Sequence, residues 1–285
     1  MSGNSNKLLA TEQFRQRKLK EKGINLNVLV VGENGVGKRS FMNTLCKGDH
    51  YTSDVAESDT FLIEIKDIIA YLEAIIPIKL RVAMTQNFGF NLDNYSNIDS
   101  LASFVDEGFR SFLEQEIKID RNPHFVDRRI HVALYFIRTS GRGLSELDRA
   151  CMKKLGQKVN LIPILAKADG LTDDELELNK FQVMKSIHDN DIQIYDFADS
   201  NSCSDEDEQM FILSLQQKVP FAAISSNTAD YKYRTTDWGT IVLGDEQNCD
   251  MVALEGVLFC SHLEQLKDTT STTKYEQFRV QRLRK

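Results

Sequence analysis

The feature that most constrains this chain is a glycine-rich loop between an apolar run and a helix-like segment, within residues 24–46. The run "INLNVLVVG" is short, β-branched and closed by a glycine, which is typical of a buried strand. The loop "ENGVGK" follows, and "RSFMNTLC" continues as a helix. Strand, glycine loop and helix in this order form the context of a phosphate-binding loop. We therefore expect an α/β fold built around such a loop.

The loop matches the phosphate-binding pattern G-x-x-x-x-G-K-[S/T] except at its last position. Backbone N–H groups of such a loop face a phosphate, and the lysine reaches the outer phosphates. The expected nucleotide contacts are Gly32, Asn34, Gly35, Gly37, Lys38, Arg39 and Ser40. The last pattern position normally gives a hydroxyl to magnesium, but here it is Arg39, and Ser40 comes one place too late. A guanidinium cannot ligate a cation, although its charge could replace one.

The rest of the chain alternates strand-like and helix-like segments. Strands are expected within 60–84 (two or three, with Pro77 near a turn), at 129–137, at 159–169 and at 219–227. Helices are expected at 98–119, 144–157 and 172–190, the last beginning with the capping box Thr172–Glu175. This alternation predicts a doubly wound, mostly parallel sheet. The acidic stretch 199–210 is expected to be a mobile insertion.

Composition excludes several classes of function. The net charge of −7 argues against general nucleic-acid binding. No apolar run approaches the length of a membrane span, and the polar N-terminus does not resemble a signal peptide. The five cysteines are scattered and the five histidines lack ligand spacing, so we expect no metal site and a reducing, cytoplasmic location.

Several stretches together resemble the septin family of filament-forming GTP-binding proteins. They are "FRQRKLKEKGINLNVLVVG", "LYFIRTSGRGLSELD", "VNLIPILAKADGLT", "TTDWGTIVL" and "LKDTTSTTKYEQFRVQRL". The resemblance covers about residues 14–283 and is nearest to fungal septins at the ends of hetero-oligomeric rods. It implies a Ras-like P-loop NTPase fold with a septin-specific C-terminal extension. The chain would divide into a basic segment at 1–23, a GTP-binding domain at 24–272 and a terminal helix or tail at 273–285.

The resemblance implies a largely kept guanine-binding side. Lys167 and Asp169 in "AKAD" match the residues that pack over the base and accept hydrogen bonds from the guanine edge. Arg234 matches an arginine that stacks on guanine, while Ser225 replaces a glycine and adds bulk beside the base. GDP, GTP or an empty pocket are all compatible with these residues.

The catalytic side departs from the family pattern. The stretch "MTQNFGF" (84–90) aligns with the second switch, where Met84 replaces the magnesium-linked aspartate. Asn87 replaces the glycine whose N–H meets the γ-phosphate, and Thr60 is at most a relic of the first-switch threonine. Phosphoryl transfer needs a metal that bridges the phosphates. We therefore expect no bound magnesium, no catalytic residue and little or no GTP hydrolysis.

The resemblance also indicates contact surfaces. Arg142 and Trp238 match positions at the subunit interface next to the nucleotide, although a lone tryptophan is also common in protein cores. The basic run consists of Arg15, Arg17, Lys18, Lys20 and Lys22. It could be a solvated helix start, or it could bind anionic lipids such as phosphoinositides. Expected partners are other septins, or a second copy through the nucleotide-side or terminal-helix face.

Three functions remain open at this point. The favoured one is a structural septin subunit in rods and filaments at membranes, serving cytokinesis, septation or sporulation. The others are a slow GTPase whose hydrolysis times assembly, and a GTP-dependent switch. The residues at positions 39, 84 and 87 argue against both.

Overall fold

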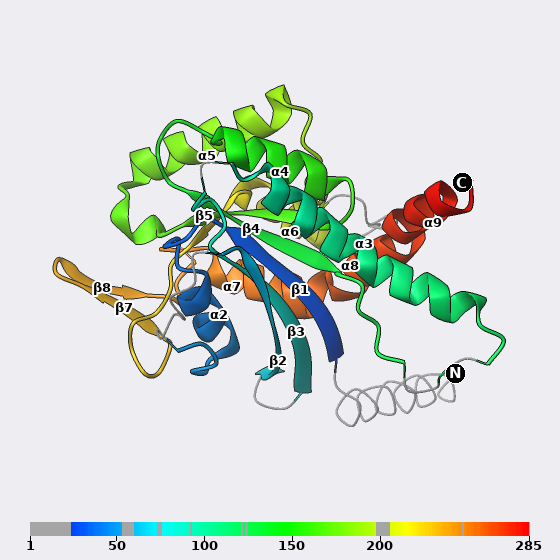
Figure 1. Cartoon of the computed structure of the whole chain (residues 1–285). Helices are drawn as coiled ribbons and strands as arrows, with labels where there is room; N and C mark the ends of the chain where they lie inside the picture. Colours follow the sequence, from blue (N-terminus) through cyan, green and yellow to red (C-terminus); the bar gives the residue numbers. More distant parts are fainter. Residues whose placement is uncertain are drawn as a thin grey trace.

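The computed structural model describes residues 24–52, 60–72, 76–91, 93–120, 122, 125–197, 206–246 and 248–284. The first half of the described chain contains β1 (Ile24–Gly32), α2 (Lys38–Cys46), β2 (Leu62–Leu72), β3 (Ile76–Gln86), α3 (Tyr95–Ile117), β4 (Val132–Arg138) and α4 (Glu146–Gly156). The second half contains β5 (Asn160–Ala166), α5 (Asp173–Asp189), α6 (Glu206–Lys218), β6 (Phe221–Ala223), β7 (Tyr233–Thr236), β8 (Gly239–Val242), α7 (Met251–Gly256), α8 (Leu263–Thr269) and α9 (Tyr275–Leu283). Short π-helical turns at Val257–Ser261 and Thr270–Lys274 join the last three helices (Figure 1).

The central sheet has the order β2-β3-β1-β4-β5-β6. The neighbours from β3 to β6 are parallel, and β2 alone runs antiparallel, beside β3. The predicted doubly wound, mostly parallel sheet is therefore confirmed. Since parallel strands end at the same edge, the loops after β1, β3 and β5 are brought together there.

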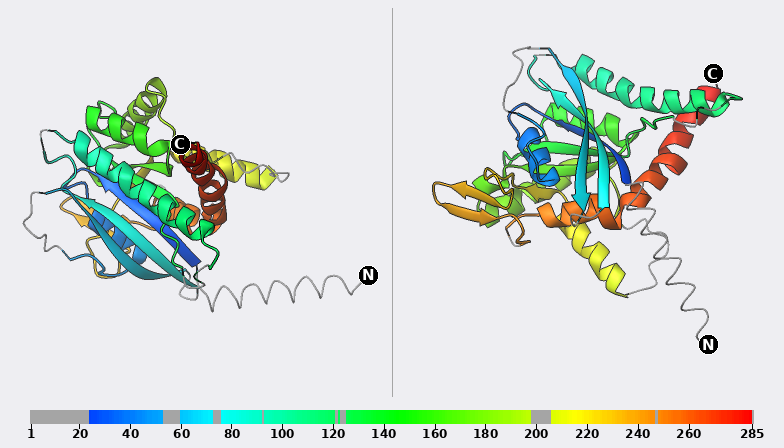
Figure 2. Two further views of the ribbon diagram at one scale, coloured as in Figure 1. Left: turned by 45° about the vertical axis from the view of Figure 1, so that its right-hand side comes forward. Right: turned by 90° about the horizontal axis from the view of Figure 1, so that it is seen from below.

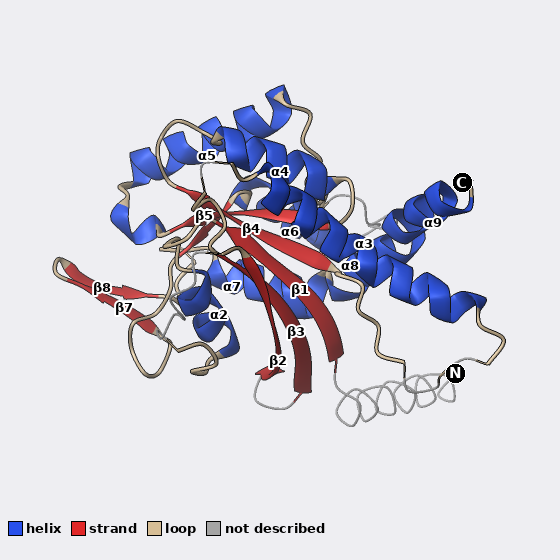
Figure 3. Ribbon diagram, viewed as in Figure 1, coloured by secondary structure: helices blue, strands red, loops and turns tan. Residues whose placement is uncertain are grey.

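Helices cover both faces of the sheet (Figure 3). In β1, side chains alternate between the faces, as the strand period requires. Leu26, Val28 and Val30 belong to the apolar cluster shared with α2 and α7. Leu29 and Val31 belong to the cluster shared with α3, α4 and α9. A run that is apolar at consecutive positions is thus explained by burial on both sides.

Three local expectations need correction. The strand expected at 219–227 is only Phe221–Ala223, because the chain then leaves the sheet toward the β7–β8 hairpin. Of the acidic stretch 199–210, expected to be a mobile insertion, residues 199–205 lie outside the described residues, whereas 206–210 form the start of helix α6. Two of its apolar residues, Ile212 and Leu215, are buried in the core, which holds the helix on the sheet. The hairpin itself was not anticipated.

The C-terminal helix packs on α3. The rings of Phe109 and Phe278 lie 5.5 Å apart, and those of Phe112 and Tyr275 lie 5.0 Å apart. Between these helices the guanidinium of Arg129 lies 3.6 Å from the Phe112 ring centre. Figure 2 shows α9 crossing beside α3 in both views. The division at 272/273 stays a prediction, and the segment 1–23 lies outside the described residues.

Candidate nucleotide site

Two glycines of the loop after β1 are required by its geometry. A Cβ on Gly32 would lie 2.7 Å from the backbone oxygen of Phe136 on β4, and the residue has a φ of 152°. Gly37 has a φ of 90° and is the N-cap of α2. Only glycine adopts such conformations at little cost. The loop therefore packs closely against β4 at Gly32, and at Gly37 it leads directly into the N-terminus of α2.

Lys38 is folded inward over the loop. Its Nζ donates to the backbone oxygens of Gly32 and Glu33, each at 2.7 Å. Burial, and then the neighbouring Arg39, lower its pKa to about 8, and the nearby Glu33 carboxylate partly offsets them. Because this pKa lies above 7, Lys38 carries its charge at neutral pH and makes the loop attractive to an anion.

Arg138, at the end of β4, contacts two residues of the loop. Its Nε lies 3.2 Å from Glu33 Oε2, and its Nη2 donates to the backbone oxygen of Asn34 at 3.3 Å. Together with Lys38, this arginine holds the loop through the chain's own side chains. Sequence reasoning missed Arg138, although its position at the end of the strand next to β1 is the available signal.

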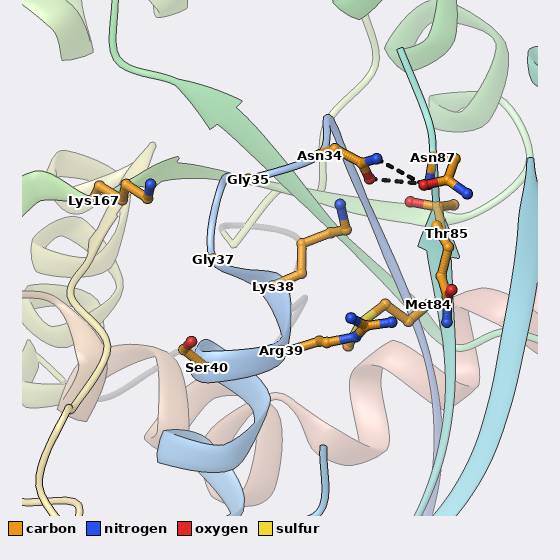
Figure 4. A pocket seen from close by; sticks show the side chains of 11 residues that line it. Asn34, Gly35, Gly37, Lys38, Arg39, Ser40, Met84, Thr85, Asn87 and Lys167 are labelled. Carbon is orange, nitrogen blue, oxygen red and sulfur yellow. Dashed lines mark hydrogen bonds between the residues drawn. The ribbon is translucent and has the colours of Figure 1, made fainter. Parts of the chain in front are cut away.

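A cavity of ≈ 450 Å³ opens over the loop, within the usual range for small-molecule sites. The expected nucleotide contacts that line it are Asn34, Gly35, Gly37, Lys38, Arg39, Ser40 and Lys167 (Figure 4). The lining continues along the end of β3 with Met84, Thr85, Gln86 and Asn87. Thr85 and Gln86 were not anticipated, although they follow Met84 directly at the end of a strand beside β1.

On the side of the cavity where a phosphate-loop protein holds magnesium, Arg39 and Met84 offer no ligand, and the nearby Glu64 carboxylate is already paired. The Nη2 of Arg39 lies 3.9 Å from Glu64 Oε2 on β2, and Gln86 donates to the same carboxylate oxygen. Met84, which is the register partner of Glu64 on β3, is buried. Magnesium prefers carboxylate, hydroxyl and water oxygens, so a cation and a thioether do not fit it. Within the described residues, no group of three or more His, Cys, Asp or Glu side chains could hold a metal.

The turn after β3 is bonded to the loop through two asparagines. Asn34 Nδ2 donates to Asn87 Oδ1 at 2.8 Å, and the backbone N–H of Asn87 donates to Asn34 Oδ1 at 2.9 Å. Asn87 Nδ2 also donates to the backbone oxygen of Thr60 at 2.9 Å. Thr60 is thus placed beside the site through its backbone.

Of the predicted base-side residues, Lys167 lines the cavity, whereas Asp169, Ser225 and Arg234 do not. Lys167, with a φ of 55°, reaches the cavity from the end of β5. Asp169 follows it and forms an ion pair with Arg234 of β7, with Nε and Oδ2 separated by 3.1 Å. Ser225 is half-buried just after β6. These last three residues do not line the cavity, so their base contacts stay predictions.

Both predicted interface residues are exposed. Trp238 lies in the turn between β7 and β8, and 76% of its surface is accessible, which excludes the core interpretation. Arg142 is exposed in the loop after β4. Figure 1 shows the β7–β8 hairpin standing out from the body near α2. The basic run Arg15, Arg17, Lys18, Lys20 and Lys22 lies outside the described residues.

The fold and the loop define the class of phosphate-loop nucleotide-binding α/β proteins. Within this class, the family model described as "Septin" matches residues 22–285. The chain belongs to the septin family, whose members are filament-forming GTP-binding proteins of the cytoskeleton. The resemblance inferred from the motifs is therefore confirmed.

Fungal septins are among the relatives. The septin homolog spn3 of Schizosaccharomyces pombe is 35% identical, over 94% of this chain and 75% of that protein. The cell division control protein 11 of Saccharomyces cerevisiae is 34% identical, over 96% of this chain and 70% of that protein. The crystal structure of Cdc11 from Saccharomyces cerevisiae superposes with a TM-score of 0.62 at 28% identity, covering 90% of this chain and 99% of that one.

Proposed function

We propose that this chain is a structural septin subunit whose nucleotide pocket supports assembly and does not hydrolyse GTP. It joins other septins in hetero-oligomeric rods and filaments at membranes. Relatives named as a cell division control protein and as a sporulation-regulated protein of Saccharomyces cerevisiae support a role at a division or sporulation site. They also support a cytoskeletal location.

One observation carries the loss of hydrolysis. The position that should hold magnesium is Arg39, which is paired with Glu64, and Met84 lies behind it. Phosphoryl transfer depends on a metal that bridges the outer phosphates and neutralises the developing charge. A fixed guanidinium can balance the charge of a bound anion, but it cannot take several oxygen ligands. The pocket can therefore hold a phosphate chain more readily than it can cleave one.

The proposed function is tested by whether rods assemble without GTP hydrolysis. The purified chain, mixed with partner septins, should form rods at similar yield with GDP, with GTP or with EDTA present. Steady-state GTP hydrolysis should stay at the level of a Lys38→Ala variant. Trp238→Ala should weaken subunit association at least about tenfold, because exposed tryptophans at interfaces often dominate binding. Rods in electron micrographs and association by analytical ultracentrifugation provide the measurements.

Val252→Ala is the matched control, because Val252 is a partly exposed apolar residue on α7 and not on the hairpin. It should leave association unchanged. Magnesium-dependent GTP turnover that limits the rate of rod formation would replace this function with the slow-GTPase alternative. Rods that form only with GTP would favour the switch.

We also propose that the basic run at 15–22 contacts anionic lipids. Its five positive charges can each gain energy near an anionic membrane surface. Changing Arg15, Arg17 and Lys18 to glutamine should reduce binding to phosphoinositide-containing vesicles several-fold at low salt. The difference should shrink as salt screens the charges. If wild type and the triple variant sediment equally with vesicles, the basic run does not bind lipid and is better described as a solvated helix start.

A further inference from the structure

A closed pair of hydrogen bonds joins the phosphate loop to the turn after β3. Each asparagine contributes its side-chain oxygen: Asn34 Oδ1 accepts the backbone N–H of Asn87, and Asn87 Oδ1 accepts from Asn34 Nδ2. Figure 4 shows the two side chains facing each other above the loop. We call this pair the asparagine latch.

The latch is built into the local backbone. Asn87 is buried and has a φ of 56°, a left-handed conformation that asparagine tolerates better than most residues. Its side-chain N–H₂ group holds the backbone oxygen of Thr60 at 2.9 Å. The loop, the turn and Thr60, two residues before β2, are therefore joined at one point. Opening the latch would break both hydrogen bonds, one of which holds the backbone N–H of the buried Asn87, and this is unfavourable.

The latch lies at the outer-phosphate end of the cavity. Loop N–H groups hold the inner phosphates, and the loop lysine reaches the outer ones. Lys167 and the latch stand on opposite sides of the loop in Figure 4. A phosphate chain that enters from the Lys167 side therefore meets Asn87 only with its last phosphate. The backbone N–H that could receive this phosphate already donates to Asn34.

In phosphate-loop switches, the third phosphate and its metal hold the switch segments in order. In this chain, side chains join the corresponding segments without either group. Arg39 adds a positive charge beside the loop, which the Glu64 carboxylate 3.9 Å away partly offsets, and this charge favours an anion without a divalent cation. A third phosphate would have to displace the latch, whereas a second phosphate would not.

We propose that the asparagine latch makes the pocket selective for a nucleoside diphosphate over the triphosphate, bound without a divalent cation. This inference rests on the proposed nucleotide pocket, and it specifies the class of ligand that the pocket binds. The latch also keeps the turn after β3 in one conformation with either nucleotide, so the subunit does not report the state of the nucleotide to its neighbours.

Calorimetric titration of the full chain with GDP and with GTP, both in EDTA, tests the selectivity. Wild type should bind GDP at least about tenfold more tightly than GTP. Asn87→Gly removes the side-chain amide, and glycine adopts the positive φ of this position easily. This variant should bind GTP more tightly, so that the affinities for GDP and GTP differ by no more than about threefold. The matched control is Asn190→Ala, since Asn190 caps α5 away from the cavity through a side-chain bond to Ser186. It should keep the wild-type ratio.

Hydrogen exchange of the nucleotide-free chain tests the latch itself. The Asn87 amide should exchange at least about tenfold more slowly in wild type than in Asn34→Ala. Equal exchange in the two proteins overturns the latch. A GTP-to-GDP affinity ratio that changes less than twofold in Asn87→Gly overturns its role in selectivity.

The remaining outcomes separate this inference from the proposed function. If wild type binds neither nucleotide, the ligand class is wrong, while rod formation with partner septins still supports the structural role. If GTP is hydrolysed but the latch and its selectivity are observed, the proposed loss of hydrolysis is wrong and the latch stands.

Discussion

Replacing Arg39 with serine and Met84 with aspartate should make nucleotide binding depend on magnesium. The double variant should bind GDP at least about tenfold more tightly with magnesium than with EDTA, which is about 1.4 kcal/mol. Wild type should differ less than twofold between the two conditions. The physical reason is that the variant supplies a hydroxyl and a carboxylate, the oxygen donors magnesium prefers, on the side now taken by Arg39 and Met84.

The same variant should be destabilised without metal. Met84 is 1% exposed, so an aspartate there buries a carboxylate, and in EDTA the free energy of unfolding should be about 2–4 kcal/mol lower than that of wild type. Magnesium with GDP should recover part of this loss. Titration calorimetry and thermal unfolding measure the two effects. Arg39→Ser alone is the control and should show no magnesium effect. No magnesium effect in the double variant would mean that the pocket has changed beyond these two positions.

Arg129→Ala should cause the largest loss of stability away from the pocket. The Arg129 guanidinium forms a forked ion pair with Asp127, with Nη2 and Oδ2 at 2.6 Å, and stacks on Phe112. It also lies 5.4 Å from the ring centre of Tyr275 on α9. Arg129 is 8% exposed, so its removal leaves a gap, and the Asp127 carboxylate keeps only the bond from the backbone N–H of residue 129. We expect a loss of about 3 kcal/mol, or a Tm lower by about 6–10 °C.

Two further variants make this prediction specific. Arg129→Lys keeps the charge but loses the planar fork and the stacking, so it should lose roughly half as much stability. Arg110→Ala removes an exposed ion pair with Glu107 on α3 and should change the free energy of unfolding by less than about 0.5 kcal/mol. Urea unfolding of the three variants provides the comparison. An Arg129→Ala protein as stable as the Arg110→Ala protein would show that α9 is held by its aromatic contacts alone.

The sequence predicted those parts of the fold whose causes are local. The apolar run 24–32 and the loop glycines required a strand and a tight turn, because strand periodicity and positive φ depend on few neighbouring residues. The capping box at Thr172 began α5 as expected. Six of the seven loop residues expected to contact a nucleotide line one cavity, all but Gly32, since a phosphate loop carries its own binding groups in succession.

Local patterns were less reliable where tertiary packing determines the bounds of an element or the exposure of a side chain. Phe221–Ala223 is shorter than its apolar run, and α6 begins in a stretch that composition assigned to a loop. The exposure of Trp238 also depends on where the hairpin stands and not on its residue type. In each case a distant part of the chain determines which apolar residues are covered.

By itself, then, the sequence determined the family and the sheet with its phosphate loop, and it predicted that Arg39 and Met84 replace the residues linked to magnesium. Only the tertiary structure decided what these positions do instead. It paired Arg39 of helix α2 with Glu64 of strand β2, closed Asn34 against Asn87, and placed Arg129 between α3 and α9. Such contacts join residues far apart in the chain, so their partners are selected by the packing of the sheet and helices and not by any local pattern.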